Sequence, residues 1–127
     1  MTLLETLVVV AILGLIAAIG FPVAHAPGSA VQLRSQAQAL VADLHRARAA
    51  AQHLDRPVTL AADADGGGWR WDGGALRTDP GLRLAASQTV TFYPDGSASG
   101  GTLTLRSPAR AARIDVDRVT GAAALVR

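Results

Sequence analysis

Cysteine and lysine are both missing from this chain of 127 residues, and aromatic residues make up only 4% of it. Without cysteine no disulfide can stabilise the fold, and the redox state of the compartment stays open. All 12 basic residues are therefore arginine, and their excess over the acidic residues is only +2. The high isoelectric point thus reflects arginine and does not indicate a strong positive field.

Charged residues are also scarce in the first quarter of the chain, where no Asp, Glu, Lys or Arg occurs between Thr6 and Leu33. A helix over residues 3–24 would be about 33 Å long, enough to cross a bilayer core of about 30 Å. We therefore predict a transmembrane helix in residues 1–26 and a separate domain in residues 27–127. The alternative is a secretory signal peptide ending at the Ala-His-Ala stretch 24–26. The acidic Glu5, the lack of basic residues before it and the length of the apolar run argue against that alternative.

Motifs for catalysis or metal binding are lacking as well. The three histidines, His25, His45 and His53, have no partner four residues away and no cysteine near them. No G-x-S-x-G elbow, P-loop or dinucleotide motif occurs. Residues 63–66 resemble the start of a calcium loop, but the third ligand and the glutamate at the twelfth position are missing. We predict no enzymatic activity, no cofactor, no metal site and an acidic turn at 63–68.

Apolar residues at steps of three and four predict a second helix over about residues 30–54. Pro57 ends it, because proline has no amide hydrogen to donate. Arg48 lies at the edge of the apolar face, where its guanidinium can bond carbonyls at the ends of strands; contact with another subunit is the alternative. The predicted apolar face consists of Leu33, Ala37, Leu40, Leu44, Ala47, Ala51 and Leu54.

The remaining part, residues 57–127, alternates apolar and polar residues in short runs separated by turns. Trp69 and Trp71 lie two positions apart and should point to one face, where we expect packing in the core or on the sheet face; an exposed patch that binds a partner is the alternative. Strands this short and closely spaced favour antiparallel sheets. We predict an α+β fold in which a long N-terminal helix packs its second half on antiparallel β-sheets as a small β-sandwich. The predicted strands are 58–62, 69–72, 82–84, 89–93, 102–106, 113–117 and 122–126.

Glu5 conflicts with the apolar helix around it. An ionised side chain costs about 2.5–3.5 kcal/mol at the centre of a bilayer on insertion scales, and less near the interface. One interpretation is a carboxylate that snorkels to the membrane surface. The other is that Glu5 pairs with a cation when helices pack together, and an α-amino group such as that of Met1 is the nearest candidate.

Residues 1–15, MTLLETLVVVAILGL, resemble the mature N-terminus of type IV pilin-like proteins. The resemblance implies that prepilin peptidase removes a leader, that the new N-terminal residue, Met1, is N-methylated, and that Glu5 pairs with the N-terminus of a neighbouring subunit. It also implies that Gly14 and Pro22 are positions where the helix melts or kinks. Met1 departs from the phenylalanine that is commoner in this family.

Three further stretches resemble the GspH/FimT family, which holds the H-type minor pseudopilins and the minor pilins FimT and FimU. Residues 91–105 match its Phe-x-Pro-Asp-Gly-Ser signature, residues 44–51 its Leu-x-x-Ala-Arg segment and residues 114–121 its closing Ile-x-Val strand and glycine turn. The resemblance implies structural roles for Arg48, Pro94, Asp95 and Gly96.

The resemblance is strongest to the H-type minor pseudopilin. It implies a non-catalytic structural subunit near the tip of the type II secretion pseudopilus, supporting protein export across the outer membrane. The implied partners are other minor pseudopilins, the major pseudopilin, the inner-membrane assembly platform, prepilin peptidase and the lipid bilayer. The implied location is the bacterial inner membrane, crossed once, with the C-terminal domain in the periplasm and in the periplasmic pseudopilus after assembly.

The alternative is a minor pilin of a type IV pilus, either FimU-like and structural or FimT-like and DNA-binding in natural transformation. DNA-binding members have a C-terminal Gly-Arg-x-Arg stretch, whereas this chain has Gly-Ala-Ala-Ala at 121–124. DNA binding is therefore the weaker interpretation. Its residues would be Arg106, Arg110, Arg113, Arg118 and Arg127.

Overall fold

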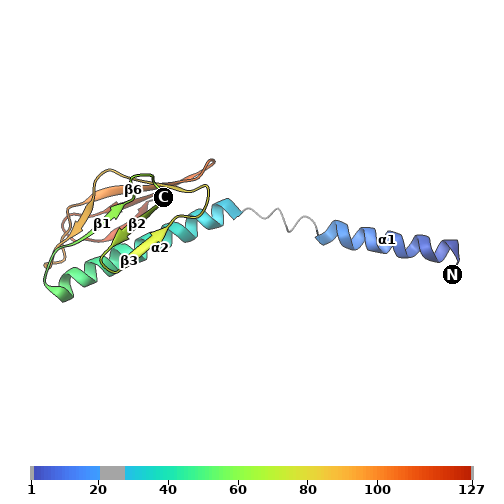
Figure 1. Ribbon diagram of the computed structural model, residues 1–127, viewed down its shortest axis with the longest axis horizontal. Coiled ribbons are helices and arrows are strands. Elements are labelled where there is room, and N and C mark those ends of the chain that lie inside the picture. The colour runs from blue at the N-terminus through green and yellow to red at the C-terminus, as the bar shows by residue number, and fades with distance from the viewer. Residues whose placement is uncertain (1, 21–27, 127) are drawn as a thin grey trace.

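The computed structural model describes residues 2–20 and 28–126 of the chain (Figure 1). Within these ranges two helices come first and short strands follow. The helices are α1 (Leu3–Gly20) and α2 (Gly28–Leu54). The strands are β1 (Val58–Ala62), β2 (Gly68–Trp71), β3 (Gly74–Arg77), β4 (Arg83–Ala86), β5 (Val90–Phe92), β6 (Gly101–Arg106), β7 (Ala111–Val116) and β8 (Ala123–Val126).

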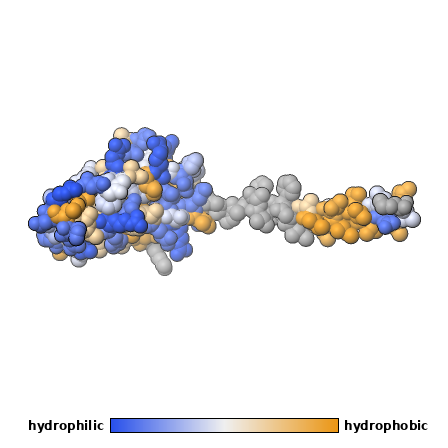
Figure 2. All heavy atoms as spheres, turned by 60° about the horizontal axis from the view of Figure 1, so that its bottom comes forward, coloured by the Kyte–Doolittle hydropathy of each residue, from blue (hydrophilic) through white to orange (hydrophobic). Residues whose placement is uncertain are grey.

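Helix α1 leaves its apolar side chains uncovered. From Leu3, which is 88% exposed, to Ile16, which is 61% exposed, ten large apolar side chains are exposed. Figure 2 shows this helix as an apolar rod beside a domain with a mostly hydrophilic surface. The predicted helix over residues 1–26 is thus present from Leu3 to Gly20, and its remainder, with Pro22, lies outside the described residues. In the described ranges, neither helix combines the length and apolarity that crossing a membrane requires.

Helix α2 confirms the helix predicted over residues 30–54. Six of the seven residues of the predicted apolar face are buried, from Leu33 to Ala51. Leu54 is the exception: it is the last residue of the helix, and 51% of its surface is exposed. Asp55 follows with a positive φ of 51°, and the Arg56 amide donates to the Ala51 carbonyl over 3.3 Å. This is the bond of a Schellman motif, which closes the helix before Pro57.

Two four-stranded antiparallel sheets pack with α2, and this confirms the predicted α+β class. One sheet has the order β3-β2-β1-β5 and the other has the order β4-β6-β7-β8. In Figure 1 the strands lie together along one side of α2. Strand β3 was not expected from the sequence, because all four of its side chains are exposed and no apolar alternation marks it. It is recognised by its backbone pairing with β2, from Gly68 opposite Arg77 to Trp71 opposite Gly74.

The core lies between α2 and the inner faces of the two sheets. Alternate strand residues point inward, as the period of two requires: Val58 and Leu60 are buried in β1, and Leu103 and Leu105 in β6. Trp69 is fully buried, which confirms its predicted place in the core. Trp71, half-buried, packs against the edge of this core.

Trp69 also makes a polar contact with α2. Its indole nitrogen Nε1 donates to Asp43 Oδ2 over 2.8 Å. A buried indole N–H without a partner would cost about 1–3 kcal/mol, so this bond offsets the desolvation of the N–H group. It also links β2 to α2. Arg46 donates to the other oxygen of the same carboxylate, Asp43 Oδ1, over 3.0 Å.

Candidate functional site

The connection between β5 and β6 contains a tight turn over residues 93–97. The Gly96 amide donates to the Tyr93 carbonyl over 3.0 Å, and the Tyr93 amide donates to the Ser97 carbonyl over 2.9 Å. Gly96 has a φ of +89°, which explains why glycine stands there. Asp95 Oδ1 accepts the hydroxyl and the amide of Ser97 over 2.6 and 3.0 Å. These two bonds, the hydroxyl first, lower the pKa of the Asp95 carboxyl.

A second turn connects β7 to β8. Asp117 Oδ1 accepts the amides of Thr120 and Val119, each over 2.8 Å. These bonds, that of Thr120 first, lower the pKa of the Asp117 carboxyl because they favour its ionised form. The Gly121 amide donates to the Asp117 carbonyl over 3.0 Å. Gly121 has a φ of +67°, so this turn too requires a residue that adopts the left-handed region.

Arg48, a residue of α2, contacts both of these turns. Its Nε donates to the Gly96 carbonyl oxygen over 3.1 Å, and its side chain is half-buried. The Gly121 backbone lies against the same place, because a Cβ at this glycine would be 2.2 Å from the Gly96 oxygen and 2.9 Å from Arg48 Nε. Only glycine fits there without displacing backbone. We call Arg48, Gly96 and Gly121 the Arg48 junction.

The junction brings together the three family-like stretches of the sequence. Arg48 comes from the helix segment 44–51, Gly96 from the signature 91–105 and Gly121 from the closing turn 114–121. They are separated by up to 73 positions in the chain, since Arg48 and Gly121 differ by 121 − 48. Asp117 was missed as a turn-forming residue, although an Asx turn at Asp-Arg-Val-Thr-Gly could have been recognised from its residue types.

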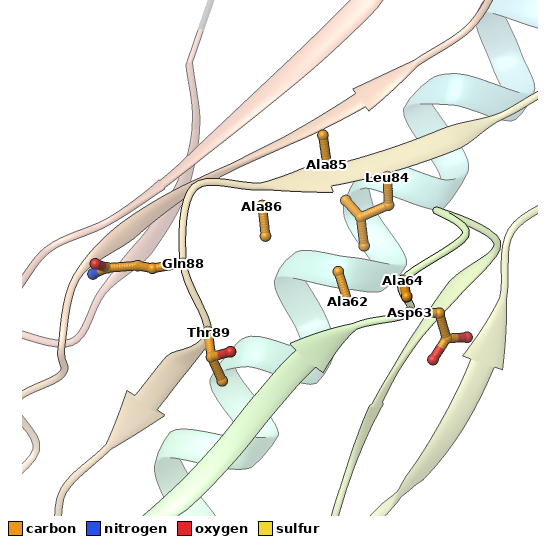
Figure 3. Close-up of a pocket in the computed structure, with 8 residues that line it drawn as sticks. All are labelled: Ala62, Asp63, Ala64, Leu84, Ala85, Ala86, Gln88 and Thr89. Carbon is orange, nitrogen blue, oxygen red and sulfur yellow. The ribbon is translucent and has the colours of Figure 1, made fainter.

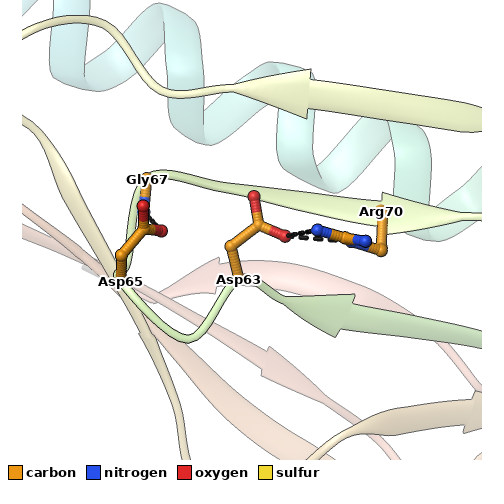
Figure 4. A network of polar contacts seen from close by, with 4 residues as sticks. All are labelled: Asp63, Asp65, Gly67 and Arg70. Carbon is orange, nitrogen blue, oxygen red and sulfur yellow. Dashed lines mark hydrogen bonds and ion pairs between the residues drawn. The ribbon is translucent and has the colours of Figure 1, made fainter.

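The acidic turn 63–68 is held by its own polar contacts (Figure 4). Asp63 Oδ1 accepts two bonds from the Arg70 guanidinium, over 2.8 and 3.0 Å. Asp65 Oδ1 accepts the Gly67 amide over 2.8 Å, and this bond is the main reason that the pKa of Asp65 is lowered. Across the described parts of the chain, no three or more His, Cys, Asp or Glu side chains gather into a metal-binding group.

A hollow of about 430 Å³ lies between the end of β1 and strand β4 (Figure 3). Small side chains line most of it, among them Ala62, Ala64 and Ala86, together with the polar Gln88 and Thr89. Its one ionisable group is Asp63, which is paired with Arg70. The hollow therefore offers no nucleophile with an adjacent base.

Within the described residues, the arginines considered for DNA contact do not all lie in one patch. Arg106 and Arg110 flank the connection from β6 to β7, and Arg118 follows the opposite end of β7. Six residues of strand span about 20 Å. Arg113 lies between them and its Nε donates to Asp115 Oδ1 over 3.0 Å, so its charge is offset. Arg127 lies outside the described residues.

The predicted assembly residues lie on or beside α1. The Glu5 amide donates to Thr2 Oγ1 over 3.2 Å, as in a helix N-cap, and the Glu5 side chain is exposed. Gly14 is on the open surface of the helix, with nothing within 4 Å of the place where a Cβ would stand. Met1 and Pro22 lie outside the described residues.

Comparison with known proteins gives three findings. A family model described as type II transport protein GspH matches residues 36–121. The fold is similar to the type IV minor pilin FimU of Pseudomonas aeruginosa, with a TM-score of 0.60, 19% identity and coverage of 75% of this chain and 88% of that chain. It is also similar to the minor pseudopilin EpsH from the type 2 secretion system of Vibrio cholerae, with a TM-score of 0.61, 15% identity and coverage of 75% and 96%. No curated protein matches the chain.

Proposed function

The chain belongs to the GspH family of type II transport proteins, whose model matches more than half of it, and we propose that it is a minor pseudopilin. In this proposal it is a non-catalytic subunit near the tip of the pseudopilus of a type II secretion system. Its partners are other minor pseudopilins and the major pseudopilin. Before assembly it is anchored in the inner membrane by the apolar N-terminal segment, with the domain in the periplasm.

The observation that carries the proposal is the uncovered apolar surface of α1. Complete burial of one large aliphatic side chain is worth about 1.5–3 kcal/mol, and α1 exposes ten of them. A surface of this kind indicates an interaction with lipid or with other apolar helices. A subunit that passes from a membrane into a filament core meets both environments in turn, and neither requires a polar face.

The carboxylate of Glu5 has a different free energy in the membrane and in the filament core. In lipid its carboxylate is desolvated without a partner. In a helix bundle an α-amino group about 4 Å away would attract it by roughly 4 kcal/mol at an effective dielectric constant near 20. We infer that this difference favours assembled subunits over stored ones. Processing and methylation of Met1 by prepilin peptidase, extraction by the assembly platform, and bending of the helix at Gly14 and Pro22 are parts of the same proposal.

A minor pilin of a type IV pilus is the second candidate, because the likeness to FimU is as strong as that to EpsH. The structural, FimU-like form of this alternative needs no feature beyond those described. The DNA-binding form needs a group of arginines that acts together. It is disfavoured because Arg118 is about a strand length from Arg110 and Arg113 is paired with Asp115.

Substitution of Glu5 tests the pairing. We expect Glu5→Leu and Glu5→Gln to be recovered in the membrane fraction like the wild type and to be depleted from sheared pseudopili. Asp55→Asn, which removes an acid at the end of α2, is the matched control and should assemble normally. Normal incorporation of both Glu5 variants would contradict the pairing.

A deletion strain separates the two candidate systems. Loss of secreted exoprotein activity with normal transformation and motility would support the pseudopilin. Loss of transformation or motility with normal secretion would assign the protein to a type IV pilus. Complementation with Arg48→Met in the same strain would show whether the Arg48 junction is needed for the process that is lost.

A further inference from the structure

Three arginines lie at the end of the domain where α2 begins. Arg34 is in the second turn of α2, Arg106 ends β6, and Arg110 precedes β7. Arg34 and Arg110 line one groove of about 420 Å³ together with the apolar Leu33 and Leu125. The Ser107 amide donates to the Arg110 carbonyl over 2.8 Å, which closes the β6–β7 connection. In Figure 1 this connection extends beside the start of α2.

These three arginines have no acidic residue close in sequence. No Asp or Glu occurs in residues 28–42 or in residues 96–114. All three side chains are exposed, and within residues 2–20 and 28–126 none of them takes part in an ion pair. By contrast, Arg46, Arg56, Arg70 and Arg113 are each paired with an aspartate.

The strand register adds like-charge repulsion at this end. Arg106 of β6 is directly opposite Arg83 of β4. Like charges at such positions destabilise a sheet unless an anion compensates them. Two acidic residues are near Arg83: Asp79, which lines a hollow with Arg83 and Arg77, and Asp65, whose carboxylate interacts electrostatically with both arginines. Arg83 is thus partly compensated, whereas Arg34, Arg106 and Arg110 are not.

Chain length places this end next to α1. Residues 21–27 separate α1 from α2, and seven residues span at most about 25 Å. Arg34 is six residues beyond Gly28, about 9 Å along the helix. The three arginines therefore lie at the end of the domain that is tethered to α1, and this end stays near the environment of α1.

We propose that Arg34, Arg106 and Arg110 bind the phosphate groups of anionic phospholipids in the membrane that holds α1, before the subunit enters a filament. This inference rests on the membrane anchoring proposed above. Guanidinium groups suit phosphates, and the partly exposed Leu125 in the groove of Arg34 and Arg110 suits the boundary between headgroups and acyl chains. The contact would hold the stored domain against the bilayer and would have to break on extraction.

The test uses the full chain reconstituted into vesicles. Because the chain has no cysteine, Ala109→Cys gives a single dye site between Arg106 and Arg110, and Val119→Cys gives one at the other end of β7. Energy transfer to acceptor-labelled lipid headgroups is measured in phosphatidylcholine vesicles, with and without 30% phosphatidylglycerol. We expect the anionic lipid to increase transfer from position 109 much more than from position 119, and 0.5 M NaCl to reverse the increase.

Charge-matched variants identify the residues. A basic residue near an anionic surface contributes about 1 kcal/mol, which is about fivefold in the ratio of bound to free domain. The variant Arg34→Gln/Arg106→Gln/Arg110→Gln should therefore lower this ratio by about 100-fold. The control Arg46→Gln/Arg56→Gln/Arg70→Gln loses the same formal charge and should stay within a few-fold of the wild type.

The outcomes separate the inference from the anchoring. If the chain fails to float with either kind of vesicle, the anchoring is wrong and the inference falls with it. If it floats with both and phosphatidylglycerol leaves the transfer from position 109 unchanged, or the control triple variant loses as much as the test variant, only the inference is overturned. Binding of a DNA duplex that depends on the same three arginines, without an effect of anionic lipid, would also overturn it in favour of nucleic acid.

Discussion

Arg48→Met is the sharpest test of the Arg48 junction. Methionine keeps most of the aliphatic stem and removes the bond from Nε to the Gly96 carbonyl. A hydrogen bond from a charged group contributes about 1.5–3 kcal/mol, and the half-buried position of Arg48 favours the lower end. We expect a loss of about 1.5 kcal/mol in the free energy of unfolding. For a domain of roughly 100 residues this lowers Tm by about 6–12 °C.

Fluorescence of Trp69 and Trp71 reports this unfolding in the full chain, because both tryptophans lie in β2. Arg46→Met is the matched control two positions away on the same helix. Its guanidinium pairs with Asp43 but its side chain is 70% exposed, so its loss should cost no more than about 0.5 kcal/mol. Equal stability of the Arg48 and Arg46 variants would refute the stabilising role of the junction.

Three further predictions concern the core and the turns. Leu40→Ala, at a fully buried position, should destabilise the domain by about 2–5 kcal/mol, whereas Leu54→Ala, at a position 51% exposed, should cost less than about 1 kcal/mol in the same denaturation assay. Trp69→Phe should cost about 1–3 kcal/mol through the lost bond to Asp43, and the same cost of Trp69→Phe in an Asp43→Ala background, where the bond is already absent, would contradict this assignment. The pKa of Asp117 is lowered in the folded state, so its ionised carboxylate adds stability above the unfolded value of about 3.9, and this contribution is lost as the pH falls through the lower folded pKa. The difference in stability between wild type and Asp117→Asn should therefore shrink below about pH 4, and a difference that is constant from pH 7 to pH 2 would rule out this coupling.

The sequence predicted the elements that have a local signature. Helix α2 was recognised because its apolar residues recur at three and four positions, and six of the seven are buried. Strands β1, β6 and β7 were recognised by their period of two. Strand β4 was predicted at residues 82–84 but runs from Arg83 to Ala86. Its pattern is weak, because only one of its four side chains, Leu84, is buried.

Other features depend on long-range pairing and have no local signature. The exposed edge strand β3 is defined by its backbone bonds to β2. The sheet order, in which β5 pairs with β1 and β4 with β6, required the structure because period-two patterning does not identify a partner strand. The arginines of residues 106–118 form one basic group in the sequence. Because β7 is extended, they are spread along its whole length in the structure.

By itself, the sequence determined the apolar N-terminal segment with its single acidic residue, Glu5, the amphipathic α2 and the alternation of the strands. Each of these follows from the spacing of residue types along a few helical turns or strand residues. The tertiary structure alone decided that Arg48, Gly96 and Gly121 meet, and that Arg34 of α2 faces Arg110 of the β6–β7 connection across one groove. Such contacts join residues tens of positions apart. They depend on how α2 packs on both sheets, and local periodicity carries no information about that packing.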